Sequence, residues 1–204
     1  ELFVATGSGR ILILDGHTYQ TLAAIVVPGV NLIRDVIVGN VDHDAELEVV
    51  VVNWTATLVF SASTLALEWT AAGMAGDRVE LGDVDGDGVV EIVVGGYDFQ
   101  VLSAVAQLRE WTYSAGNFRE MAVGDIDSDG RAEIAWTNSS ALKVLDGDSR
   151  ALKWQRTDLW DATALTIANI DFTGAPELLV AYYQSSSVTA LQGGDGATLW
   201  SIDP

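Results

Sequence analysis

Cysteine is absent from the 204-residue sequence, which excludes disulfides, thiolate chemistry and cysteine-ligated zinc. Lysine and arginine are scarce, ten against 29 aspartates and glutamates, so the formal net charge is −19. Nucleic-acid phosphates and anionic membrane surfaces attract clustered cations, and the composition therefore argues against both as partners. No apolar run is long enough to span a bilayer, and we expect no membrane insertion.

The abundant acids gather in short repeated segments. Residues 83–91 read Asp-Val-Asp-Gly-Asp-Gly-Val-Val-Glu. Aspartates at alternate positions can direct three carboxylates into one tight loop, Gly88 permits the turn, and Glu91 can close the ligand shell. The backbone carbonyl of Val89 can add a further oxygen, and oxygen ligands at this density suit Ca²⁺. The alternative is an Asp/Gly-rich hairpin turn without metal.

The same segment recurs along the chain. Residues 125–133 repeat every ligand position, 40–48 begin with Asn and carry Ala45 in place of the glycine, and 169–177 carry Thr173 in place of the third aspartate. The segments start at 40, 83, 125 and 169, so they are 43, 42 and 44 residues apart. A fixed period of this size indicates a propeller or a solenoid. Whether the fourth segment binds metal stays open.

These segments differ from EF-hand loops, whose bidentate glutamate stands at position 12 between two helices. Here the glutamate is the ninth residue, and strand-forming residues such as Ile92-Val93-Val94 follow it. The pattern therefore predicts a calcium loop within a β-hairpin.

Each period contains four short β-type segments separated by turn residues, the size of a propeller blade. We predict an all-β protein, a β-propeller of four-stranded antiparallel blades, as one domain over residues 1–204. The predicted blades are a partial one over 1–28 and full ones over 31–72, 75–115, 117–157 and 162–203. Because Glu1 aligns with the ninth position of a loop, we expect the chain to be a fragment of a larger propeller or assembly.

A tryptophan ends the fourth segment of each complete blade: Trp69, Trp111, Trp154 and Trp200. Recurrence at one framework position indicates packing at the blade edge rather than a cofactor site.

The pattern G-D-[VI]-D-x-D-G-x-x-E-[IV], present at 82–92 and 124–134, resembles the FG-GAP/VCBS repeats of integrin α-subunit propellers and of secreted bacterial propellers. The Trp-ended strands also resemble quinoprotein-type repeats. The resemblance implies Ca²⁺ as cofactor and loops that join the first and second strands of each blade on its lower face. The implied ligands are Asp83, Asp85, Asp87, Val89 and Glu91; Asp125, Asp127, Asp129, Arg131 and Glu133; and Asn40, Asp42, Asp44, Glu46 and Glu48.

The opposite, upper face is expected to carry exposed aromatics from the other links, namely Trp54, Tyr97, Trp160 and Tyr183. These can stack on sugars or contact a protein, or they can cap the core. Arginines at the starts of the inner strands, Arg34, Arg78 and Arg119, can bind an acidic ligand. The alternative is that they pair with Asp35, Asp77 and Glu120.

The favoured function is an extracellular or cell-surface binding module that recognises protein or glycan in adhesion. The alternatives are a polysaccharide lyase resembling rhamnogalacturonan lyases, and a lectin. No catalytic residue is predicted, because His17 and His43 are the only histidines and are expected to be exposed, and no Ser-His-Asp pattern appears. An enzyme is therefore not the expected class.

Overall fold

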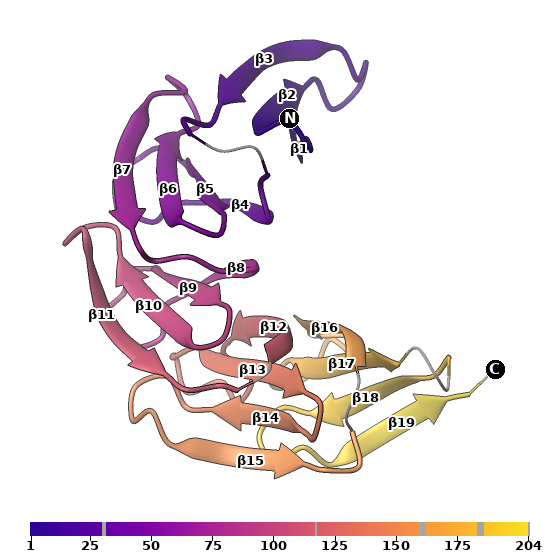
Figure 1. Cartoon of the computed structure of the whole chain (residues 1–204). Helices are drawn as coiled ribbons and strands as arrows, with labels where there is room; N and C mark the ends of the chain where they lie inside the picture. The colour runs from indigo at the N-terminus through magenta and orange to yellow at the C-terminus, as the bar shows by residue number, and fades with distance from the viewer. Residues whose placement is uncertain (30–31, 117, 160–161, 183–185, 204) are drawn as a thin grey trace.

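The computed structural model describes residues 1–29, 32–116, 118–159, 162–182 and 186–203 (Figure 1). All regular structure in these ranges is β-strand, in one three-stranded and four four-stranded antiparallel sheets. The first sheet contains β1 (Leu2–Ala5), β2 (Arg10–Leu14) and β3 (Thr21–Val26). The second contains β4 (Asp35–Gly39), β5 (Glu48–Val52), β6 (Ala56–Ser61) and β7 (Leu67–Ala72).

The other sheets repeat this order of four consecutive strands. The third contains β8 (Arg78–Gly82), β9 (Glu91–Gly95), β10 (Phe99–Ser103) and β11 (Leu108–Tyr113). The fourth contains β12 (Phe118–Gly124), β13 (Glu133–Asn138), β14 (Leu142–Leu145) and β15 (Leu152–Arg156). The fifth contains β16 (Ala162–Ala168), β17 (Glu177–Tyr182), β18 (Val188–Gln192) and β19 (Thr198–Ile202).

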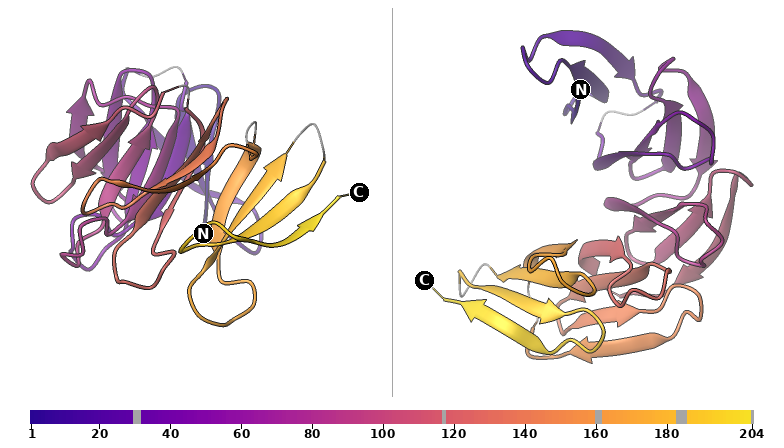
Figure 2. Two further views of the ribbon diagram at one scale, coloured as in Figure 1. Left: turned by 90° about the horizontal axis from the view of Figure 1, so that it is seen from below. Right: turned by 180° about the vertical axis from the view of Figure 1, so that it is seen from behind.

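The five sheets follow one another around an open arc (Figure 1; Figure 2). The first strands β4, β8, β12 and β16 lie on its inner side and contact one another, while β7, β11, β15 and β19 lie outside. This is the arrangement of propeller blades, so the predicted fold class is confirmed, with four full blades and a partial one. The assignment of the whole chain to one domain stays a prediction.

The hydrophobic core lies between neighbouring sheets. In the cluster between the third and fourth sheets, Phe99 packs edge-on against Trp136 with ring centroids 5.0 Å apart. Every residue of β5 and β9 is buried, because a second strand is covered on both faces by the adjoining sheets. This position explains the unbroken apolar runs of these strands, which would alternate in polarity if one face met water.

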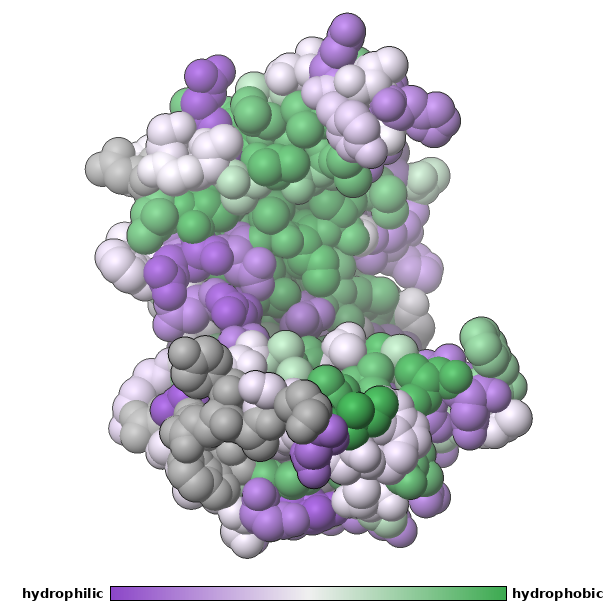
Figure 3. Space-filling model, turned by 90° about the vertical axis from the view of Figure 1, so that its right-hand side faces the viewer, coloured by the Kyte–Doolittle hydropathy of each residue, from purple (hydrophilic) through white to green (hydrophobic). Residues whose placement is uncertain are grey.

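The end sheets have no such cover on one side. Leu2 and Val4 of β1, and all five residues of β19, are exposed. The view toward the open side of the arc shows a broad hydrophobic area (Figure 3).

A glycine ends the first strand of the second, third and fourth sheets, because the next blade approaches closely there. A Cβ on Gly82 would lie 2.6 Å from Cγ1 of Val123 and 2.9 Å from Cβ of Ala132, both in the next sheet or its loop. A Cβ on Gly39 would lie 2.5 Å from Cδ1 of Leu81. The glycines therefore set the spacing between blades.

We expect Gly82→Ala to lower the free energy of unfolding by about 1–3 kcal/mol, because the added methyl overpacks the interface. Chemical denaturation monitored by tryptophan fluorescence measures the change. Gly7→Ala is the matched control, since nothing lies within 4 Å of a Cβ at that position. Equal stability of the two variants would contradict the close approach.

Candidate metal centres

The ninth residue of every acidic loop is a glutamate that begins the second strand of its blade. One carboxylate oxygen, Oε2, accepts a hydrogen bond from the backbone N–H of the loop's second residue. The four bonds measure 2.8 Å (Val41 to Glu48), 2.9 Å (Val84 to Glu91), 3.0 Å (Ile126 to Glu133) and 2.9 Å (Ile170 to Glu177). We call this bond the glutamate clasp, and it closes each loop across seven residues.

The clasp is buried in the first three loops. Glu48 and Glu91 are only 1% and 2% exposed, and Val84 is fully buried within the core between the third and fourth sheets. The apolar second residue therefore anchors the loop in the core, and its N–H fixes the glutamate. A carboxylate in such a place needs hydrogen bonds or a counter-charge to offset lost hydration.

The loop 83–91 is shaped by bonds from side chain to backbone. Asp83 accepts from the N–H of Gly86 at 2.7 Å and from that of Gly88 at 2.9 Å. Both glycines have positive φ, 77° and 87°, which side chains rarely tolerate. Carboxylate oxygens of Asp83, Asp85 and Glu91 converge within 4.8 Å of one another.

Asp87 lies outside this convergent group, and its Oδ1 instead accepts from the N–H of Val89 at 2.7 Å. The structure thus brings together three of the four carboxylates predicted for this loop. The carbonyl role predicted for Val89, and likewise for Arg131 and Glu46, stays a prediction.

The loop 40–48 is built similarly. Asn40 accepts from the N–H of His43 at 2.9 Å and donates to the carbonyl of Asp44 at 2.6 Å. The convergent carboxylates are Asp42 and Glu48, and the third member is Glu68 of β7.

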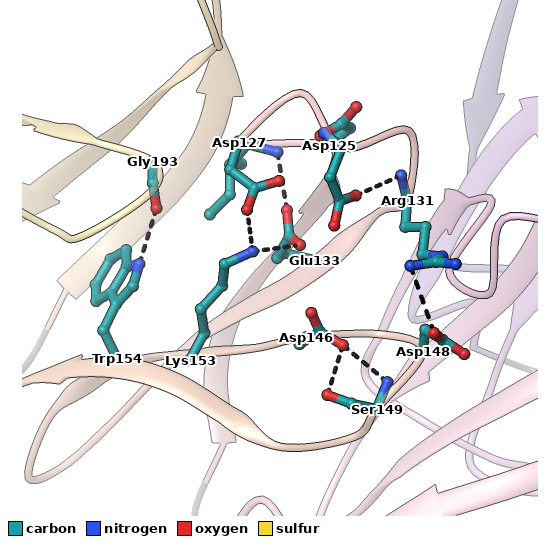
Figure 4. Close-up of polar contacts among 12 residues, drawn as sticks. Asp125, Asp127, Arg131, Glu133, Asp146, Asp148, Ser149, Lys153, Trp154 and Gly193 are labelled. Atoms are coloured by element: carbon teal, nitrogen blue, oxygen red, sulfur yellow. Dashed lines mark hydrogen bonds and ion pairs between the residues drawn. The ribbon is translucent and has the colours of Figure 1, made fainter.

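The loop 125–133 gathers Asp125, Asp127 and Glu133, and Asp129 approaches Glu133 together with Asp146. A lysine of the fourth strand enters this loop, as Figure 4 shows: Lys153 Nζ forms ion pairs with Asp127 and, at 3.0 Å, with Glu133. The sequence prediction of a metal site at this loop did not include that cation.

The fourth loop keeps the clasp but has two acids where each of the other loops has four. Asp171 accepts hydrogen bonds from the N–H and hydroxyl of Thr173, both at 2.8 Å. Asp171 and Glu177 line an open pocket of about 330 Å³ together with Leu199 of β19.

One residue of each outer strand reaches these loops because the strand carries a β-bulge. The register between third and fourth strands shifts by one residue just before the recurring tryptophan, which leaves one residue extra in the fourth strand. In the four full blades the extra residues are Glu68, Glu110, Lys153 and Leu199. A bulge re-aims a side chain, and here it directs these residues to the loop of their own blade. Sequence reasoning missed them, although the place before the tryptophan marks them.

Burial and crowding of acids raise carboxyl pKa values in the first two loops. Burial, together with the neighbouring charges of Asp85 and Glu110, raises the pKa of Glu91 to about 7, against the lowering effect of its bond from Val84. The pKa of Glu48 is raised for the same reasons, with Asp42 among the neighbours. A bound cation would relieve both effects, and hard oxygen donors at this density fit Ca²⁺.

Three of the recurring tryptophans, Trp69, Trp111 and Trp154, pack against the next blade, whereas Trp200 of the last sheet is 38% exposed. Trp154 Nε1 donates to the carbonyl of Gly193 at 2.8 Å, and the guanidinium of Arg150 lies 5.0 Å from the ring of Trp111. These contacts agree with the predicted packing role.

Arginines near the axis pair across blade boundaries. Arg34 reaches Asp77 at 2.7 Å, and Arg78 reaches Glu120 at 3.2 Å, so the predicted alternative of ion pairing is observed for both. Arg119 is the second residue of β12. A ligand-binding role for the three stays a prediction.

The upper links expose two of the four predicted aromatics. Trp54 is 68% exposed, with the Arg34 guanidinium 5.1 Å from its ring centroid, and Tyr97 is 77% exposed. Trp160 and Tyr183 lie outside the described residues. The histidines His17 and His43 are both exposed, as expected.

No protein-family model and no curated protein matches the sequence. Among solved structures, the chain is similar to BBS1N crystallised in complex with ARL6DN, with a TM-score of 0.78 and 14% identity over 99% of this chain and 63% of that one. It is also similar to the biofilm matrix protein Bap1 of V. cholerae, with a TM-score of 0.61 and 19% identity over 97% of this chain and 34% of that one. The chain thus spans less than two thirds of either.

These likenesses and the blade architecture define the chain as a β-propeller. Within the part of the chain that the structure describes, no helix is long and apolar enough to cross a membrane.

Proposed function

We propose that the chain forms part of a calcium-stabilised extracellular β-propeller of the FG-GAP/VCBS type that binds protein or glycan through its upper face. The calcium is structural and is held by the hairpin loops. The observation that carries the proposal is the pair of buried glutamates, Glu48 and Glu91, each facing further carboxylates. Among the described residues, neither forms an ion pair with a lysine or arginine.

The donor sets support Ca²⁺ over other divalent ions. Carboxylate and carbonyl oxygens suit Ca²⁺, which accepts six to eight of them in irregular geometry, whereas Mg²⁺ demands a near-ideal octahedron. The residues that would hold the ion are Asn40, Asp42 and Glu48 in one loop, and Asp83, Asp85 and Glu91 in the next. When bound, the ion would supply the positive charge that these buried carboxylates lack.

The proposal places the chain outside the cell. Calcium sites of extracellular modules have Kd values of about 10⁻⁴–10⁻³ M, and such sites are filled where free calcium is millimolar. The resemblance to repeats of integrin α subunits and secreted bacterial propellers favours the same location. Bap1, one of the structural neighbours, is a biofilm matrix protein by its description.

The upper face supplies the binding surface. Trp54 and Tyr97 project from the links between second and third strands, and exposed aromatic rings give large contact area to sugars and to protein side chains. Trp54 is held in place, because Arg34 lies over its ring and its Nε1 donates to Asp77 at 3.4 Å. BBS1N was crystallised with another protein, which agrees with partner binding by a propeller of this shape.

Calcium should raise the melting temperature measured by scanning calorimetry, and a chelator should lower it. One site at a hundredfold excess over Kd adds about 2.7 kcal/mol, roughly 5–10 °C for a domain of this size. The double variant Asp85→Asn/Glu91→Gln should lose about half of the shift. Asp203→Asn, which removes an exposed acid, is the control and should keep it. A melting temperature indifferent to chelation would refute structural calcium.

The double variant Trp54→Ala/Tyr97→Ala should reduce binding at least about tenfold, because aromatic anchors of interfaces each contribute more than about 1 kcal/mol. The measurement is the binding of fluorescently labelled protein to a glycan array and to immobilised rhamnogalacturonan, in millimolar Ca²⁺. Val105→Ala is the control, because Val105 is an exposed apolar residue at the opposite end of the blade that carries Tyr97. Full binding by the double variant would exclude this face, and cleavage of rhamnogalacturonan by the wild type would favour the lyase alternative.

A further inference from the structure

The bulge of the outer strand places a different chemical group at each metal loop. Glu68 joins Asp42 and Glu48 within 4.8 Å, and Glu110 is the extra residue at the equivalent bulge of the next blade. At the same place the next blade has Lys153 and the last has Leu199. The same backbone device thus delivers a negative, a positive or an apolar side chain.

Lys153 is built into its loop rather than lying over it. Its side chain is 19% exposed, and Nζ contacts Asp127 and the fully buried Glu133 (Figure 4). Burial by itself would lower the pKa of this lysine, yet the bonds to Asp127 and Glu133 raise it above the ordinary value, so the ammonium stays charged. Its stem projects from β15 toward the loop (Figure 4), and the indole of the adjoining Trp154 is fixed to the next blade by its bond to Gly193.

We propose that the extra residue at the bulge of each outer strand determines which cation the loop of that blade holds. The Lys153 ammonium serves as the permanent cation of loop 125–133, while Glu68 and Glu110 complete calcium sites at loops 40–48 and 83–91. This inference rests on the proposed function for the first two loops and changes the assignment of the third. Loop 125–133 is then held together without metal.

Electrostatics make the two cations mutually exclusive. Nζ lies within hydrogen-bond distance of two of the three carboxylates that converge in the loop, Asp127 and Glu133. A divalent ion on the same carboxylates would meet the ammonium at a few ångströms, where like charges repel by several kcal/mol at an effective dielectric constant near 20. At the loops that Glu68 and Glu110 approach, the added carboxylate increases the negative charge and therefore favours binding of a cation.

The fourth loop fits the same rule. Leu199 brings no charge, and Thr173 replaces the third aspartate. The loop keeps only two acids, Asp171 and Glu177. It therefore has too few carboxylates to bind calcium under this rule, and it has no lysine to take the place of calcium. The chain is therefore expected to hold two calcium ions, in adjacent blades.

Native mass spectrometry of the full chain in Ca²⁺, with isothermal titration, counts the ions. The wild type should bind two. Lys153→Met, which keeps the aliphatic stem, should bind three, and Glu110→Lys should bind one. Lys143→Met is the matched control, since Lys143 stands on the neighbouring β14 and lies 5.9 Å from the ring of Trp136 instead of in a loop; it should bind two.

Melting in chelator gives a second readout that does not depend on ion counting. Lys153→Met should melt lower than the wild type without calcium and recover on its addition, whereas Lys143→Met should show no such calcium rescue beyond that of the wild type.

Three ions in the wild type, or an unchanged count in both Lys153→Met and Glu110→Lys, would overturn the inference while leaving structural calcium intact. No bound ion in any variant would instead overturn the proposed function. If Lys153→Met fails to fold even with calcium, Glu110→Lys decides the matter alone.

Discussion

A buried carboxylate that accepts one backbone N–H is the interaction on which this propeller depends. The glutamate clasp joins the first residue of the second strand to the second residue of the preceding loop, and it recurs in all four full blades at 2.8–3.0 Å. In the first three loops the donor residue (Val41, Val84 or Ile126) lies fully buried in a core cluster, so the clasp ties loop, strand and core together. Its cost is a desolvated negative charge, which a nearby cation can offset.

The loops also connect neighbouring blades. The N–H of Ala132, in the third loop, donates to the carbonyl of Asp83, in the second, at 2.7 Å. Gly82, which ends β8, has no side chain, so Val123 and Ala132 can pack against it. Near the axis the Arg34–Asp77 and Arg78–Glu120 ion pairs bridge successive blades as well. A change of charge in one loop is therefore expected to affect the packing of the next blade.

The regular period and the D-x-D-x-D-G-x-x-E pattern were enough to predict the blades and the loops, because both depend on local spacing. Residues brought in by tertiary structure could not be found in that way. Glu68, Glu110 and Lys153 stand about twenty residues from their loops, and only the shifted register before the tryptophan aims them there. Asp87, whose spacing matches a ligand, lies outside the convergent carboxylates and accepts the N–H of Val89, and its role as a ligand stays a prediction.

Amide hydrogen exchange at the clasp donors, followed by NMR with and without Ca²⁺, tests the central claim most directly. The N–H groups of Val41 and Val84 should exchange at least about tenfold faster in chelator, since a cation worth more than 1.4 kcal/mol then no longer holds their acceptor glutamates. The N–H of Ile126 should be equally protected in both conditions, because Lys153 holds Glu133. Equal protection of all three donors with and without calcium would contradict the account.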